Sequence, residues 1–182
     1  MAARTESAAR LPLRSAPSVA PDAITLLKQD HQRIDALFRH FEQLERDGVE
    51  KAAVVQMICT ELRLHTQVEE EIFYPAVRTA TGEDALTDAA DVEHALARAL
   101  VEELESMKPG DDHYDAMVAV LATHERQHME KEHQEMFPRA CATRLDLERL
   151  GAAIAVRKRE LLGQSENATE PAPRAIGARL LS

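Results

Sequence analysis

The stretch His65-Thr66-Gln67-Val68-Glu69, followed by Tyr74-Pro75, has a second copy in this chain. That copy is His128-Met129-Glu130-Lys131-Glu132, followed by Phe137-Pro138. Both read His, three residues, Glu, four residues, an aromatic residue and Pro. Residues four apart stack on one face of an α-helix, so each copy aims an imidazole and a carboxylate at the same point. Two such pairs, together with single histidines on two other helices, predict a metal site inside a helical bundle.

Composition supports an all-α protein. The chain has 182 residues, which is enough for one domain with a substantial core. It is rich in Ala, Leu, Glu and Arg, which favour helices, and it contains no Trp. The net charge of -10 disfavours nucleic acid and anionic membrane surfaces as partners. Its apolar runs are shorter than the roughly 18–20 residues of a membrane span.

Three segments are expected along the chain: a disordered tail over 1–21, a bundle over 22–162 and a second disordered tail over 163–182. The first segment has three arginines and lacks the apolar core of a secretory signal, although its Arg/Ser bias leaves a transit peptide as an alternative. Cys59 and Cys141 form no closely spaced pair, so we expect reduced thiols in a cytoplasmic protein rather than a disulfide.

The hydrophobic pattern predicts four long helices with short links, and hence an up-down-up-down four-helix bundle. They are expected at about 22–47, from 49 to Tyr74-Pro75 or a turn beyond, from the end of the 79–84 loop to 108, and from 111 to Phe137-Pro138. The last position is expected to end or kink the fourth helix, because Pro lacks an amide proton. A short fifth helix is expected over 145–162.

The chain places one histidine of each long helix at the same depth, roughly 14–17 Å from one end of the bundle at the helical rise per residue. Any one histidine on an apolar stripe is usually a hydrogen-bonded core residue. Burying two carboxylates and four imidazoles together, however, costs several kcal/mol per charge unless a metal compensates. The shared depth therefore favours a metal centre, formed by His31, His65, Glu69, His94, His128 and Glu132.

The donor types restrict the metal. Six ligands exceed the four of a tetrahedral zinc, and no thiolate is present. Imidazole with bridging carboxylate suits two irons, with manganese or zinc as substitutes. The simplest arrangement gives each ion two histidines and makes Glu69 and Glu132 bridges, with oxo, hydroxo or water in the remaining positions.

The order His, His-x3-Glu, His, His-x3-Glu resembles the hemerythrin-like (HHE cation-binding) family over roughly residues 22–138. The resemblance implies a non-haem di-iron centre that meets O2, peroxide or nitric oxide. Carried over residue by residue, it implies the same six ligands.

The chain departs from oxygen-carrying hemerythrins at two points. Their second histidine on the third helix is replaced by Arg98, and their last helix separates His from its carboxylate by five residues, where this chain has His133 after Glu132. One histidine fewer leaves both ions open and disfavours reversible O2 storage. The six-ligand set is more similar to di-iron proteins that repair iron centres under nitrosative stress, although their Cys-bearing N-terminal module is missing here.

Three functions remain open at this point. The protein could be an enzyme that slowly decomposes peroxide or reduces nitric oxide. It could store or sense oxygen or iron without turnover, or it could use the metal only to fold. The protein partner and the oligomeric state are not indicated.

Residues around the ligands divide into supporting and solvent-facing groups. Asp30 and Glu93 each precede a ligand and are expected to hydrogen-bond to ligating histidines. Tyr74 is expected to pack against the site or to support it. His124 is read as a hydrogen-bonded core histidine rather than an added ligand or a proton relay. The following are expected to face solvent: Glu70, Glu71, His113, Glu130, His133 and Glu135.

Overall fold

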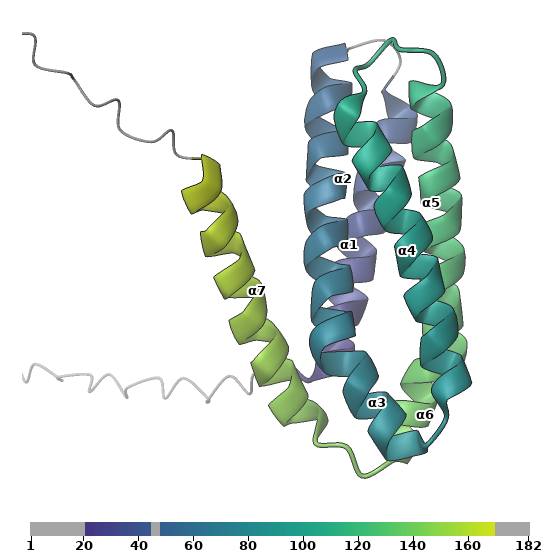
Figure 1. Cartoon of the computed structure of the whole chain (residues 1–182), viewed down its shortest axis with the longest axis vertical. Helices are drawn as coiled ribbons and strands as arrows, with labels where there is room; N and C mark the ends of the chain where they lie inside the picture. Colours follow the sequence, from purple (N-terminus) through teal and green to yellow (C-terminus); the bar gives the residue numbers. More distant parts are fainter. Residues whose placement is uncertain (1–20, 45–47, 170–182) are drawn as a thin grey trace, which may run out of the picture.

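The computed structural model describes residues 21–44 and 48–169, with side chains described as far as 164. Its helices are α1 (Ala23–Gln43), α2 (Gly48–Val68), the π-helix η1 (Glu69–Phe73), α3 (Tyr74–Thr81), α4 (Asp84–Ser106), α5 (Tyr114–Lys131), the π-helix η2 (Glu132–Met136), α6 (Phe137–Ala142) and α7 (Leu147–Thr169). The long helices α1, α2, α4 and α5 surround a common core (Figure 1). The expected four-helix bundle is therefore confirmed.

The first helix begins where the sequence predicts. Asp22 caps it, because the carboxylate oxygen Oδ1 accepts a hydrogen bond of 2.9 Å from the Thr25 amide. The helix ends at Gln43, before the expected end near 47, and residues 45–47 lie outside the described part of the chain.

The two copies of the motif form the same irregular structure. After Glu69 and after Glu132 the helix widens into a π-helical turn, in which the Tyr74 and Phe137 amides donate to the carbonyls five residues earlier. Pro at the next position cannot donate to the carbonyl four residues back, and its ring would collide with that carbonyl in a regular α-helix. The widened turn relieves this conflict. Neither helix ends at its proline, since α3 and α6 follow η1 and η2 without a break, and α3 bends away from the axis of α2 (Figure 1).

A polar layer divides the core in two. One apolar cluster contains Ile34, Leu62 and Ala97, and the other contains Leu27, Val68 and Ala90. On α1, His31 lies between Leu27 and Ile34, and each of the other long helices inserts its polar residues at the corresponding step. The six candidate ligands therefore sit between two apolar clusters that keep water away from them.

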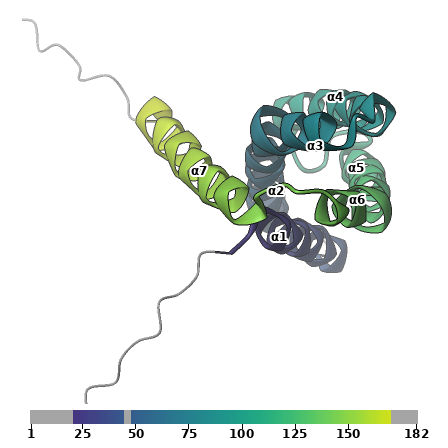
Figure 2. The same cartoon turned by 90° about the horizontal axis from the view of Figure 1, so that it is seen from below.

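The fifth helix lies outside the bundle and packs against α1 and α2, from which its C-terminal half diverges (Figures 1 and 2). Gly151 permits the close approach, because a Cβ at this position would lie 2.4 Å from the Pro21 carbonyl oxygen. The expectation that the helix ends at Leu162 is wrong, since α7 continues to Thr169. The tails expected over 1–21 and 163–182 otherwise fall almost entirely outside the described residues, which omit 1–20 and 170–182.

Two further expectations concern the described residues as a whole. Cys59 is buried and Cys141 is exposed. Both are free thiols, as expected, and no disulfide joins them. Within residues 21–44 and 48–169, no helix is both long and apolar enough to cross a membrane.

Candidate metal centre

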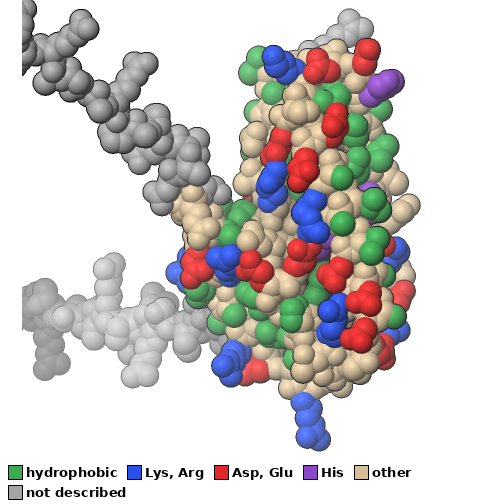
Figure 3. Space-filling model, in the orientation of Figure 1, with side chains coloured by type: hydrophobic (Ala, Val, Ile, Leu, Met, Phe, Trp, Pro, Cys, Tyr) green, Lys and Arg blue, Asp and Glu red, His purple; other side chains and the backbone are tan. Residues whose placement is uncertain are grey.

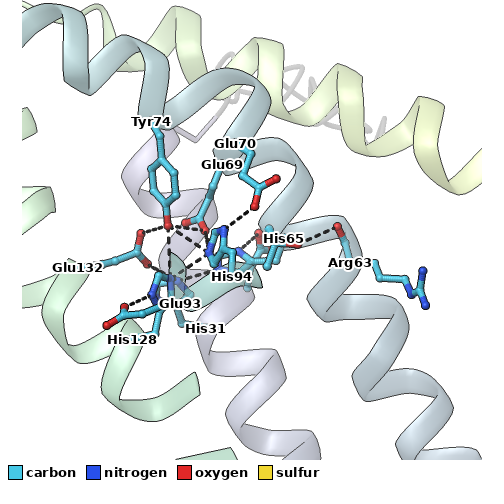
Figure 4. A network of polar contacts seen from close by, with 12 residues as sticks. His31, Arg63, His65, Glu69, Glu70, Tyr74, Glu93, His94, His128 and Glu132 are labelled. Atoms are coloured by element: carbon cyan, nitrogen blue, oxygen red, sulfur yellow. Dashed lines mark hydrogen bonds and ion pairs between the residues drawn. The ribbon is translucent and has the colours of Figure 1, made fainter. Parts of the chain in front are cut away.

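The structure brings all six predicted ligands together in one buried cluster (Figure 4). They come from four helices, because α1 supplies His31, α4 supplies His94 and each motif copy supplies a His and a Glu. No member of the set is more than 4% exposed. Their donor atoms form two groups, each compact enough to surround an ion.

The first group contains His31, His65, Glu69 and Glu132. The Nε2 atoms of His31 and His65 are 3.1 Å apart. Glu132 Oε2 lies 3.2 Å from the former, and Glu69 Oε2 lies 3.2 Å from the latter. These separations suit four donors that share one cation.

The second group contains His94, His128 and again Glu69. The two Nε2 atoms are 3.1 Å apart, and Glu69 Oε2 lies 3.4 Å from that of His94. Glu132 is also near, with Oε2 3.8 Å from the Nε2 of His128. Both carboxylates thus lie between the two histidine pairs.

The charges of the cluster favour a cation. Burial lowers the pKa of His65 to about 3 and that of His94 to about 4, so these imidazoles are neutral, which is the form that binds a metal. Burial and the charge of Glu132 raise the pKa of Glu69 well above its usual range. Glu69 Oε1 is buried without a hydrogen-bond partner. An ion beside this orphaned oxygen would neutralise both carboxylates, so the residues present fit a metal centre.

Two of the four imidazoles are hydrogen-bonded from behind by a carboxylate, and a third, His65, lies within ion-pair distance of one without a hydrogen bond to it. The Nδ1 atom of His128 lies 2.8 Å from Glu93, that of His94 lies 3.0 Å from Glu70, and that of His65 lies 3.5 Å from Asp30. A carboxylate on Nδ1 fixes the tautomer with its free lone pair on Nε2, toward the cluster. The hydrogen bond predicted for Glu93 is confirmed, whereas Asp30 lies beside His65 at ion-pair distance only. Glu70 was wrongly placed on a solvated face.

Each of these carboxylates is itself paired with a cation at the surface. Lys131 pairs with Glu93, Arg98 with Glu70, and both Lys158 and Arg33 with Asp30. Arg98 thus supports His94 through Glu70. These cations keep the carboxylates charged, and a charged carboxylate accepts a stronger hydrogen bond from an imidazole.

His31 is held differently. Its Nδ1 atom lies 2.8 Å from Nε2 of His133, and the two rings stack with centroids 5.0 Å apart. His133 is exposed as expected, but it also supports a candidate ligand, which the sequence reading missed. In the sequence, the only indication of this role was that His133 directly follows the candidate ligand Glu132.

Two other polar residues on α5 lie near the cluster without joining either donor group. His124 hydrogen-bonds through Nε2 to the Glu93 carbonyl oxygen at 2.9 Å, which confirms its reading as a hydrogen-bonded histidine. Glu125 is 1% exposed, and its Oε2 has no hydrogen-bond partner. Burial and the charges of Glu132 and Glu93 raise the pKa of Glu125 to about 8. In the sequence, nothing distinguishes Glu125 from the other glutamates of this helix.

Tyr74 reaches the middle of the cluster (Figure 4). Its hydroxyl oxygen lies 2.9 Å from Glu132 Oε1 and 3.2 Å from Glu69 Oε2. It also lies 3.2 Å from Nε2 of His94 and 3.3 Å from Nε2 of His128. The sequence reading expected only packing or support from this residue. A regular helix would turn it roughly 140° away from Glu69, and the π-helical turn brings it back.

The comparisons with known proteins identify the family. The family model for the hemerythrin HHE cation-binding domain matches residues 22–140. The chain belongs to this family. As an HHE domain it is a metal-binding helical bundle, and its His and Glu residues form the groups suited to a cation.

Two proteins similar to this HHE domain show its fold and the limits of the likeness. A solved structure of an HHE cation-binding domain-containing protein from Mycobacterium kansasii is 24% identical, covers 81% of this chain and 91% of its own, and superposes with a TM-score of 0.71. A curated protein of Nostoc sp. (strain PCC 7120), named DNA nickase, is 26% identical over 112 residues. The match covers 62% of this chain, which spans only 31% of the length of that relative.

Proposed function

We propose that this HHE domain holds two iron ions and reacts through them with a small oxidant or diatomic gas: O2, peroxide or nitric oxide. His31, His65, His94 and His128 would bind the ions in pairs, and Glu69 and Glu132 would bridge them. The paired ions would supply electrons to the incoming molecule. The protein would supply a dry, fixed set of donors.

The observation that carries this proposal is the division of the buried cluster into two donor groups that share Glu69. A single ion would leave one imidazole pair without a metal in the core, and burying those polar groups uncompensated would destabilise the fold. Two ions use every donor and neutralise both carboxylates. Imidazole with bridging carboxylate is a donor set suited to iron.

A surface pocket reaches the edge of the cluster. It lies between α4 and the α5–η2 segment, has a volume of about 530 Å³, and reaches His128 and Glu132. Ala89 and Ala90 line it and leave space beside the cluster.

Metal analysis of the purified protein tests the proposal. We expect two irons per chain in the wild type and loss of iron in His65→Ala and His128→Ala. His40→Ala is the matched control, because His40 is exposed, pairs with Glu50 and belongs to neither donor group. One metal per chain, or full iron in both ligand variants, would contradict the proposal.

Measuring turnover distinguishes an enzyme from a sensor and from a store of iron or oxygen. A protein that decomposes peroxide or reduces nitric oxide over many cycles is an enzyme. One that binds the gas once and then changes its affinity for another protein is a sensor, and one that only holds iron or oxygen is a store. We expect slow turnover in the cytoplasm, the reducing setting that two free thiols support.

The name of the Nostoc relative suggests nucleic acid as a second partner, but the charge of this chain disfavours it. The net charge is -10, and acidic and basic side chains are interspersed over the face in Figure 3 without a continuous basic area. Phosphate binding requires such an area. Gel-shift titration at low salt should therefore show no retained DNA.

A further inference from the structure

We propose that Tyr74 is a fifth protein ligand of the ion held by His94 and His128, and that the two ions are therefore chemically unequal. The inference rests on the proposed two-ion centre and adds a donor to one half of it. It also decides which ion a small molecule can reach.

The spacing of the donor atoms supports coordination. Metal–nitrogen and metal–oxygen bonds of roughly 2.1 Å place neighbouring donors at right angles about 3.0 Å apart. The Nε2 atoms of His94 and His128 are 3.1 Å apart. The Tyr74 hydroxyl oxygen lies 3.2 and 3.3 Å from them and 2.9 Å from Glu132 Oε1. The phenol oxygen is thus spaced from the donors as they are from one another.

The hydrogen-bonding capacity of a phenol cannot account for these contacts. The Nδ1 atoms of His94 and His128 face the carboxylates of Glu70 and Glu93, which accept only, so the ring protons lie there. Both Nε2 atoms therefore present lone pairs to Tyr74. With Glu69 and Glu132, up to four acceptors surround one hydroxyl that has a single proton to donate. A cation among them would satisfy every lone pair.

The second motif copy provides an internal comparison. Phe137 occupies the position of Tyr74, and its ring stacks against His31 with centroids 5.8 Å apart. The two halves of the cluster therefore receive equivalent rings from the two π-helical turns. Only the ring beside His94 and His128 has an oxygen.

Coordination by Tyr74 would decide which of the two ions has a free coordination position. The His94/His128 ion would have five protein donors, against four for the His31/His65 ion. An oxo or hydroxo bridge would fill the sixth position of the former and leave one position on the latter. On coordination the phenol O–H bond breaks, its electron pair forms the metal–oxygen bond, and the proton passes to water. The expectation that both ions are open would then be wrong.

The first test uses the intact chain loaded with iron and oxidised in air. A ferric phenolate gives a visible charge-transfer band whose resonance Raman modes shift when the tyrosine ring is deuterated. We expect this signature in the wild type and in Tyr114→Phe, and its loss in Tyr74→Phe. Tyr114 is a fair control, because it is the one other tyrosine, is 3% exposed and packs with Phe41 in the other apolar cluster.

Iron analysis of the same samples separates the two proposals. Two irons without tyrosinate modes in the wild type would overturn the inference and keep the proposed function. A chain without iron would overturn both. The wild-type and Tyr114→Phe spectra decide the question even if Tyr74→Phe fails to fold, which circular dichroism reports.

Ligand titration tests the inequality of the ions. We expect the wild type to bind one azide per iron pair and Tyr74→Phe to bind two, a twofold change in stoichiometry. Two azides bound by the wild type would overturn the assignment.

Discussion

Lys158 of α7 forms an ion pair with Asp30 of α1, a contact between residues 128 positions apart in the chain. Asp30 is 2% exposed, and its other contacts include Nδ1 of His65 at 3.5 Å. Burial alone would raise the pKa of Asp30, but His65 and Lys158 hold it at about 2. The helix outside the bundle thus helps to keep charged the carboxylate that orients a candidate ligand.

Replacing Lys158 with Met should weaken metal binding while leaving the fold intact. The carboxylate that orients His65 would keep only Arg33 as a cationic partner, so we expect affinity to fall about tenfold, at the low end for such supporting residues. Chelator competition measures the change. Arg159→Met is the control, since that exposed side chain donates to Ala155 of its own helix. Equal affinities in the two variants would refute the link.

Removing the metal should lower the melting temperature. Glu69 and Glu132 face each other in a dry core, and the ion that neutralises them binds the native state alone. At a thousandfold excess over Kd the loaded form should melt on the order of 10 °C higher. In Glu69→Gln the difference in melting temperature between the loaded and metal-free forms should shrink. The variant removes the repulsion between the two carboxyl groups in the metal-free form and a ligand in the loaded form. Calorimetry of the four samples checks both statements.

Glu125 should make the metal-free protein less stable at alkaline pH. Its pKa is raised from 4.5 to about 8, so between these values the native state keeps a proton that the unfolded chain has lost. Stability contributed by the neutral carboxyl is therefore lost as pH rises through this window. Between pH 5 and pH 9 the free energy of unfolding of Glu125→Gln should rise relative to that of the wild type by on the order of 2–4 kcal/mol.

Urea unfolding at the two ends of this window measures the difference. Glu103→Gln, which changes an exposed glutamate of α4, is the control and should follow the wild type. A wild-type minus Glu125→Gln difference that does not change with pH would show that the carboxyl is solvated.

The reduced, iron-loaded protein should oxidise in air within minutes and should not return to the reduced state when the gas is removed. This chain lacks the additional histidine of oxygen carriers and has Arg98 in its place. The ion held by four protein donors keeps an open position, and we expect electron transfer to the gas there to prevail over reversible release. The same sample should bind nitric oxide, and the oxidised form should degrade peroxide slowly. Absorbance followed through cycles of air and vacuum decides, since full recovery of the colourless reduced form would identify an oxygen carrier.

The sequence alone was sufficient for the bundle and for the six candidate ligands. A His and a Glu four residues apart share a helix face wherever the helix is packed, so their convergence needs only local geometry. The doubled motif and the single histidines at matching depth then place the polar layer. The sequence also singled out Asp30 and Glu93 as supporting residues, because each precedes a ligand by one residue, whereas the histidines they contact, His65 and His128, were decided by how the helices pack.

The roles of Tyr74, Glu70, His133 and Glu125 were decided by tertiary structure. Tyr74 reaches the cluster because a π-helical turn changes the angle between residues five apart, which a regular helical pattern does not contain. Glu70 supports His94 because a residue of α2–η1 meets α4, and Lys158 reaches Asp30 because α7 folds back onto α1. Contacts between helices depend on how those helices pack, whereas helical spacing within each helix is a local property of the backbone.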